Sequence, residues 1–91
     1  MEHEMKLNSD SFERMKSGFK RTEVRLNDDK RKKVKVGDII IFSKRPELKE
    51  RLKARVIGRK EVKTHLGMDR YYSKEEQDKY GFVIFELVFL W

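Results

Sequence analysis

The sequence predicts an α+β domain in which a small, closed or nearly closed β-sheet carries short helices at its rim. The first observation behind this prediction is the order of the expected elements, which is strand, helix, three strands, helix and a closing strand. The second is that the strands are short and are separated by polar turns. The third is the length of 91 residues, which suits one compact core, so we expect residues 1–91 to form a single domain.

The chain is expected to begin with a strand that leads directly into a helix. Apolar and charged residues alternate over 2–7, which is typical of a half-buried strand. Asn8 or Ser9 then caps a helix that continues to about Ser17, because either side-chain oxygen can accept a hydrogen bond from a backbone N–H of the first turn. Gly18 is expected to end this helix, since glycine readily adopts the left-handed conformation common at helix ends.

The apolar face of this helix is defined by three residues at helical spacing. Phe12, Met15 and Phe19 are all expected to pack inward. A second strand is predicted over 20–26, directly after the glycine. Residues 27–33 then form a charged connection with room for one helical turn.

The two strands in the middle of the chain are expected to differ in burial. A turn at 36–38 leads into 39–42, where three consecutive isoleucines and a phenylalanine favour a strand buried on both faces over a helix. Residues 52–58 alternate in polarity and predict a long strand with one strongly basic face, in which Gly58 marks a bulge or bend. Residues 61–70 have only a weak pattern and predict a short connection.

The C-terminal part of the chain predicts a short helix and a closing strand. Ser73 and Glu76 have the spacing of a capping box, in which each side chain accepts from the other residue's backbone N–H. The helix is expected to end near Tyr80, with Gly81 as its terminator. Residues 82–90 are nearly all apolar and predict the closing strand.

The charge of the chain indicates a polyanionic partner. The 23 Lys and Arg against 16 Asp and Glu give a net charge of +7, and the sequence pI is about 9.7. Residues 14–33 and residues 44–63 each contain nine basic and three acidic side chains, a net charge of +6 per block. The alternative is that lysine-rich faces only keep a small domain soluble. We favour nucleic acid as the partner, because the positive charge is segregated along the chain.

Several classes of protein and site are not indicated by the sequence. There is no cysteine, and the apolar run over 82–91 contains Glu86 and is too short to span a bilayer as a helix. Met1 is followed by acidic residues, so no signal peptide is visible, and we expect a soluble, cytoplasmic protein. His3 and His65 lack partners at metal-ligand spacing. No phosphate-binding or dinucleotide-binding glycine pattern is present, so we expect neither a metal nor a cofactor.

Three segments together resemble the ASCH (activating signal cointegrator homology) domain of the PUA-like superfamily. They are GFKRTEVR at 18–25, VGD at 36–38 and YGFVIFE at 80–86. The resemblance covers nearly the whole chain and implies a small PUA-like mixed β-barrel with two or three short flanking helices. It also implies a cleft between the barrel and its helices, used for RNA or nucleotides.

The resemblance also raises an enzymatic alternative, from which this sequence departs in two places. Some members of the family act as amidohydrolases on N4-acetylcytidine, and others have been linked to RNA cleavage. Lys20 matches the lysine of the amidohydrolase branch, but Glu23 stands where that branch has a threonine. Thr22 is one residue away and is expected on the other face of the strand. In addition, the 61–70 segment is shorter than its counterpart in the family.

The strongest group of candidate site residues lies on the second predicted strand. Glu23 and Arg25 are two residues apart and therefore share a face, and the long side chain of Lys20 can reach the same face. In a cleft, the two cations would receive phosphate or carbonyl oxygens, while Glu23 would accept from a base amino group or orient the cations. The alternative is a Glu–Arg pair on a solvated face, which contributes little energy.

Other candidate nucleic-acid-binding residues lie later in the chain. Lys53, Arg55 and Arg59 would contact a phosphate backbone without reading sequence, and the alternative for them is a solvated strand face. Tyr71 and Tyr72 lie among polar residues and would stack on bases.

Glu86 is an isolated carboxylate in the apolar closing strand. If it is buried it needs a cationic partner, for which Lys20, Arg25 and Arg55 are the candidates. Alternatively it faces water at a sheet edge.

These observations predict an RNA- or nucleotide-binding module with a basic cleft beside the barrel. The enzymatic alternative is a hydrolase in the same cleft, acting on N4-acetylcytidine-type nucleosides or cleaving RNA, with Lys20 and Glu23 as its candidate catalytic residues. A second alternative is an adaptor whose basic faces bind an acidic protein partner.

Overall fold

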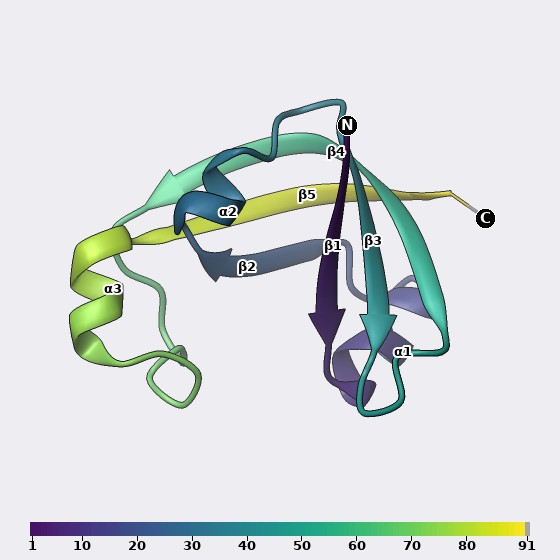
Figure 1. The fold of residues 1–91 in the computed structure, drawn as a ribbon, viewed down its shortest axis with the longest axis horizontal. Helices are drawn as coiled ribbons and strands as arrows, with labels where there is room; N and C mark the ends of the chain where they lie inside the picture. Colours follow the sequence, from purple (N-terminus) through teal and green to yellow (C-terminus); the bar gives the residue numbers. More distant parts are fainter. Residues whose placement is uncertain (91) are drawn as a thin grey trace.

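The computed structural model describes residues 1–90, and its five strands form one sheet that curls into a half-barrel (Figure 1). Three short helices accompany the sheet, which confirms the predicted α+β class. None of the helices in this described part is long and apolar enough to cross a membrane. In chain order the elements are β1 (Glu2–Leu7), α1 (Ser9–Lys16), β2 (Thr22–Leu26), α2 (Asp29–Lys32), β3 (Ile39–Lys44), β4 (Arg51–Val62), α3 (Lys74–Tyr80) and β5 (Phe82–Leu90).

The sheet has the strand order β1-β3-β4-β5-β2, so β1 and β2 are its two edges. β1 runs parallel to β3, and the other neighbouring pairs are antiparallel. The pairing of β4 with β5 shifts register between Val56 and Gly58, which confirms the predicted irregularity at this glycine. Because a bulge bends its strand, β4 arches over the molecule, and β1 and β3 run across the direction of β2 and β5 (Figure 1).

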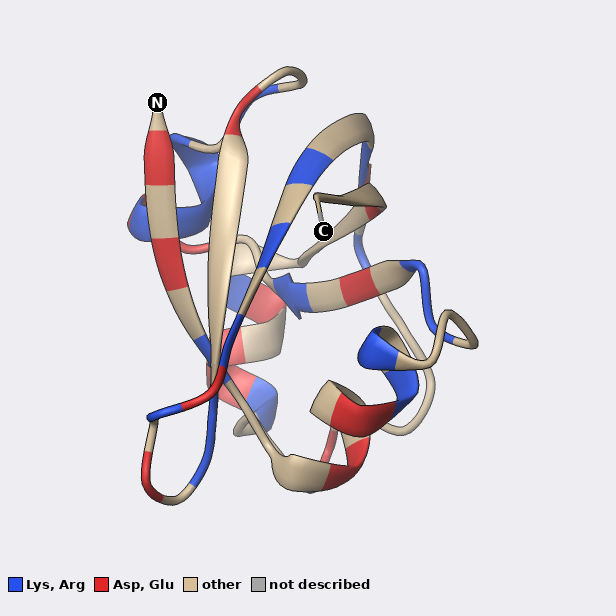
Figure 2. Ribbon diagram, turned by 90° about the vertical axis from the view of Figure 1, so that its right-hand side faces the viewer, with Lys and Arg blue, Asp and Glu red and all other residues tan. Residues whose placement is uncertain are grey.

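The core lies inside the curl and is built from α1 and four of the strands. Phe12 and Met15 of α1 pack against Phe42 of β3 and Phe85 of β5, and all four side chains are fully buried or nearly so. β3 carries almost no charge, whereas its neighbour β1 alternates acidic residues with uncharged ones from the N-terminus onward (Figure 2). The alternating burial of β1 and the central burial of β3 therefore match their sequence patterns.

The helix α1 has the predicted start, but the prediction for Phe19 is wrong. The side chain of Asn8 caps the helix by accepting from the backbone N–H of Ser11 at 2.8 Å. At the other end Gly18 has φ +86°, and the N–H of Phe19 donates to the carbonyl of Arg14. Helical periodicity ends at this glycine, so Phe19 is not carried to the apolar face of α1 and is 85% exposed.

β4 is longer than predicted, and the connection after it is correspondingly shorter. Glu61 and Val62 still pair with β5, so this strand includes the first residues of the segment expected to be irregular. The second strand is shorter than expected at its start, since β2 begins at Thr22.

The helix α3 begins and ends as predicted. The Ser73 side chain accepts from the N–H of Glu76 at 3.1 Å, and the Glu76 side chain accepts from the N–H of Ser73 at 3.3 Å. Gly81 has φ +66° and donates its N–H to the carbonyl of Gln77 at 2.9 Å. The predicted capping box and glycine terminator are therefore confirmed.

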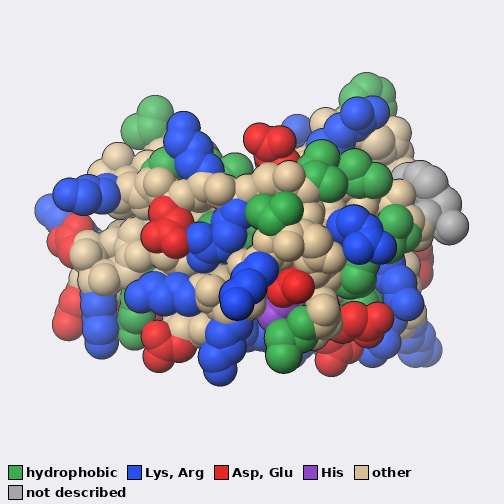
Figure 3. Space-filling view, turned by 90° about the horizontal axis from the view of Figure 1, so that it is seen from above, with side chains coloured by type: hydrophobic (Ala, Val, Ile, Leu, Met, Phe, Trp, Pro, Cys, Tyr) green, Lys and Arg blue, Asp and Glu red, His purple; other side chains and the backbone are tan. Residues whose placement is uncertain are grey.

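The outer face of β4 and β5 is a mixed surface, and Glu86 lies on it. Glu86 is exposed although β5 is an inner strand, so of the two alternatives it faces water, but not at a sheet edge. A Cβ added to Gly58 would come within 3.1 Å of the Glu86 carboxyl carbon, so the glycine leaves space for this side chain. Seen from above, basic, acidic and hydrophobic side chains are intermixed (Figure 3).

Asp38 connects the start of β1 to the turn before β3. Its carboxylate lies 2.9 Å from His3 Nε2 and accepts from the backbone N–H of Lys35 at 3.0 Å. The amino group of Met1 lies 3.5 Å from the same carboxylate. The contact with His3, followed by that with Lys35, lowers the pKa of Asp38 from 3.8 to about 2.

We expect Asp38 to contribute stability that is lost in acid. Since its pKa in the folded protein is below the ordinary value, its stabilisation is complete well above pH 3.8 and disappears as the pH falls through about 2. Asp38→Asn should therefore be less stable than the wild type at pH 5, and the gap should close between about pH 4 and pH 2. Urea midpoints measured by circular dichroism across this range test the expectation. The matched control is Glu47→Gln, which changes an exposed carboxylate. If its stability difference from the wild type had the same pH dependence, the effect could not be assigned to Asp38.

The opening between the two edge strands is bridged by one side chain. Arg25 on β2 donates through Nη2 to the backbone carbonyl of Lys6 on β1 at 2.6 Å. The same guanidinium donates through Nε to Glu23 at 2.7 Å. The Arg25 and Glu23 side chains are only 13% and 9% exposed, so this contact is poorly screened by water. Arg25 thus links strands that do not pair with each other in the sheet.

Arg25→Ala should lower the free energy of unfolding by about 2–4 kcal/mol, because it leaves one oxygen of the buried Glu23 carboxylate without its cation and breaks the link to Lys6. Arg21→Ala is the control, since Arg21 is exposed on the same segment, and it should change stability by no more than about 0.5 kcal/mol. Chemical denaturation of both variants measures the difference. Equal stability of the two variants would show that the bridge is energetically unimportant.

Candidate functional site

A cavity of about 520 Å³ lies in the opening between β1 and β2. Its walls come from the end of β1, the start of α1, β2 and the connection between β4 and α3. Five of the residues predicted from the sequence line it together: Lys20, Glu23, Arg25, Tyr71 and Tyr72. We call it the aromatic cavity. The fold therefore brings the charged candidates of β2 and the tyrosines of a distant segment to one place.

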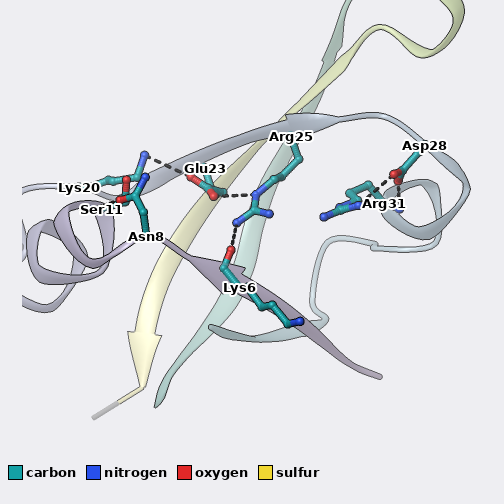
Figure 4. A network of polar contacts seen from close by, with 8 residues as sticks. All are labelled: Lys6, Asn8, Ser11, Lys20, Glu23, Arg25, Asp28 and Arg31. Carbon is teal, nitrogen blue, oxygen red and sulfur yellow. Dashed lines mark hydrogen bonds and ion pairs between the residues drawn. The ribbon is translucent and has the colours of Figure 1, made fainter. Parts of the chain in front are cut away.

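The charged wall of the aromatic cavity is centred on Glu23, which is only 7% exposed. Its two carboxylate oxygens contact different cations, Lys20 Nζ at 3.3 Å and Arg25 Nε at 2.7 Å (Figure 4). Alternation along β2 places Glu23 and Arg25 on one face, and the turn after α1 brings Lys20 beside them. The three side chains form one interacting group with a net charge of +1.

The hydroxyl next to Glu23 does not line the cavity. Thr22 is exposed and pairs with Glu86, which lies on the outer face of the sheet. This is the placement that strand alternation predicts.

The aromatic wall is held in place by α3 and β5. The ring of Tyr72 lies 6.2 Å from that of Phe82 in a tilted arrangement. The side-chain amide of Gln77 donates to the Tyr72 carbonyl and to Asp69, each at 3.0 Å. Tyr71, in contrast, is 58% exposed. The short connection therefore presents one anchored and one accessible ring to the cavity.

The sequence did not indicate several other residues that line the aromatic cavity. Asn8 and Ser11 come from the start of α1, and Arg45 follows β3. The cap at Asn8 was recognisable, but its position opposite β2 depends on how the sheet curls. His65 also lines the cavity, and no group of three metal-ligating side chains occurs within residues 1–90.

A second cavity of about 460 Å³ continues along the same opening. It shares Lys6, Arg25 and Arg45 with the aromatic cavity. Its further charged residues are Glu4, Lys30, Arg31 and Arg51. We call it the basic cavity. Figure 4 shows the Arg25–Lys6 contact between the Glu23 group on one side and Arg31 on the other.

Three predicted residues do not line either cavity. Lys53 and Arg55 are exposed on the outer face of β4, where Arg55 donates to the carbonyl of Gly37 at 3.1 Å. Arg59 is partly buried and donates to the carbonyl of Val34 at 3.0 Å and to Glu61 at 2.5 Å. The contact with Arg59 lowers the pKa of the Glu61 carboxyl. A role for these three residues in nucleic-acid binding stays a prediction.

Comparisons with known proteins agree with the fold. The sequence model of the ASCH domain matches residues 5–90. The crystal structure of hypothetical protein PH0355 is similar, with a TM-score of 0.84, 30% identity and coverage of 99% of this chain and 100% of that one. The solution structure of protein PF0455 from Pyrococcus furiosus gives a TM-score of 0.71, 30% identity and coverage of 99% and 98%. No curated protein matches the chain. On the extent of the domain match, the chain belongs to the ASCH domain family.

Proposed function

We propose that this ASCH domain binds RNA or a nucleotide in the aromatic cavity. The observation that carries the proposal is the meeting of two tyrosines with Lys20, Glu23 and Arg25 around one concave space. Aromatic rings supply stacking surfaces for bases, and cations supply contacts for phosphates. A space of about 520 Å³ is within the usual range for small-molecule sites.

Each group has a distinct role in this proposal. The exposed ring of Tyr71 stacks on the base, and the anchored Tyr72 forms the floor beside it. Lys20 donates to phosphate or carbonyl oxygens. Glu23 keeps lone pairs beyond those that its two cations use, so it can also accept from a base amino group.

Binding is favoured over amide hydrolysis by the position of the hydroxyl group. The family's hydrolases have a threonine where this chain has Glu23, and Thr22 lies on the opposite face of β2. Both oxygens of Glu23 already contact cations, an arrangement that suits an orienting group.

Tyr71→Ala is expected to weaken binding of a short single-stranded RNA or of a mononucleotide by roughly 5- to 150-fold, the loss of one base–aromatic stack. The fold should be unaffected, since the ring is more than half exposed. Fluorescence anisotropy and calorimetry measure the two affinities.

The control is Phe19→Ala, which removes an exposed ring that does not line the cavity. This variant should bind as the wild type does. An equal effect of the two substitutions, or none from Tyr71→Ala, would remove the basis for stacking in this cavity.

A longer RNA is expected to contact the outer face of β4 as well. Reversing Lys53 and Arg55 to Glu should leave mononucleotide affinity unchanged and weaken binding of a strand long enough to reach this face. The slope of log affinity against log salt should fall by about 1.4, the value for two lost phosphate contacts on a single strand. Lys74→Glu with Lys79→Glu makes the same charge change on α3. An equal loss with that pair would mean that only net charge matters.

A further inference from the structure

The two cavities form one groove with different chemistry at its two ends. They share Lys6, Arg25 and Arg45, so they adjoin on either side of the Arg25–Lys6 contact, and a ligand that lies over this contact reaches both. Both tyrosines line the first cavity, whereas no aromatic residue lines the second. A base therefore has a stacking surface at one end only.

The basic cavity is strongly cationic. Six Lys or Arg side chains line it against the single acidic residue Glu4. Glu4 lies 3.4 Å from Arg51, and both of these side chains are more than half exposed. Within residues 1–90, no ion pair is formed by three of the other cations: Lys6, Lys30 and Arg45. Such a hollow is suited to an anion with several oxygen acceptors.

Arg31 provides a second, independent indication of a missing acceptor. One end of its guanidinium donates to Asp28 at 2.9 Å, and this contact orients the side chain (Figure 4). Its Nε is buried and has no hydrogen-bond partner within the described residues. A buried donor without an acceptor is costly, so a shift of the Arg31 side chain, which is 19% exposed, that brings this N–H to a phosphate oxygen would be favourable.

We propose that the basic cavity is a phosphate subsite, and that the ligand is a phosphorylated nucleoside whose base occupies the aromatic cavity. This inference rests on the proposed function, because it takes the base to lie beside the tyrosines. Lys30, Arg31 and Arg51 hold the phosphate, and Arg25 lies where base and phosphate meet. The phosphate belongs either to a mononucleotide or to the backbone of an RNA strand.

The test compares ligands that differ only in phosphate. Each of the four nucleosides, its 3′- and 5′-monophosphates and the matching dinucleoside monophosphates are titrated by calorimetry. We expect a monophosphate to bind about tenfold or more tightly than its nucleoside, as charge-assisted hydrogen bonds allow. The Arg31 Nε–H resonance should shift with monophosphate but not with nucleoside. Tightest binding of the dinucleoside monophosphate identifies a strand as the source, and tightest binding of a monophosphate identifies a mononucleotide.

Two double variants distinguish phosphate binding in the basic cavity from a general effect of positive charge on the protein. Lys30→Ala with Arg51→Ala removes two cations of the basic cavity and should reduce monophosphate affinity about tenfold, leaving nucleoside affinity unchanged. Lys33→Ala with Lys49→Ala is the matched control, since both lysines are exposed, one after α2 and one before β4, and line neither cavity. Equal losses in the two pairs would overturn the subsite.

Different experimental results would reject the phosphate subsite and the proposed base site. Equal affinity for nucleoside and monophosphate, together with a loss in Tyr71→Ala, rejects the subsite and keeps the base site. The converse result is binding that depends on the phosphate, is weakened by Lys30→Ala with Arg51→Ala, and is unchanged in Tyr71→Ala. This result supports the subsite and rejects the base site.

Discussion

The structure depends on the contact of the Arg25 guanidinium with both Glu23 and the backbone of β1. The curled sheet has two edges that do not pair, and an unpaired strand edge exposes backbone groups. Arg25 satisfies one of these groups, the Lys6 carbonyl, while Glu23 fixes the orientation of its guanidinium. The bridge therefore holds the sheet at the width at which the edges frame a groove.

This arrangement explains why a carboxylate lies in a basic groove. Lys20 and Arg25 approach the same point from two sides, and without Glu23 they would face each other as like charges with little water between them. Glu23 joins them into one group and leaves a net positive charge for a ligand. The further cations of the basic cavity need no such partner, because Lys30 and Arg45 are exposed to water.

Local features of the fold were predictable because they depend on neighbouring residues. The cap at Asn8, the capping box of Ser73 and Glu76 and the irregularity at Gly58 were each visible in a few letters. The prediction for Phe19 failed because a single glycine ended the helical period before it. At the site, strand alternation and the family motif identified Lys20, Glu23 and Arg25. Arg45 and Arg51 were not identifiable as groove residues, because only the curl of the whole sheet brings them opposite β2.

The bridge between the edges has a consequence for how the groove is encoded. β1 and β2 stand at opposite ends of the sheet order, yet Lys6 and Arg25 are only 19 residues apart in the chain. One continuous segment, β1-α1-β2 with the following turn of α2, supplies both rims of the groove, and β3, β4 and β5 span the distance between them. Changes within about the first third of the chain can therefore alter the charged rims of the groove, while the tyrosines of the aromatic cavity and the strands that carry most of the core stay as they are.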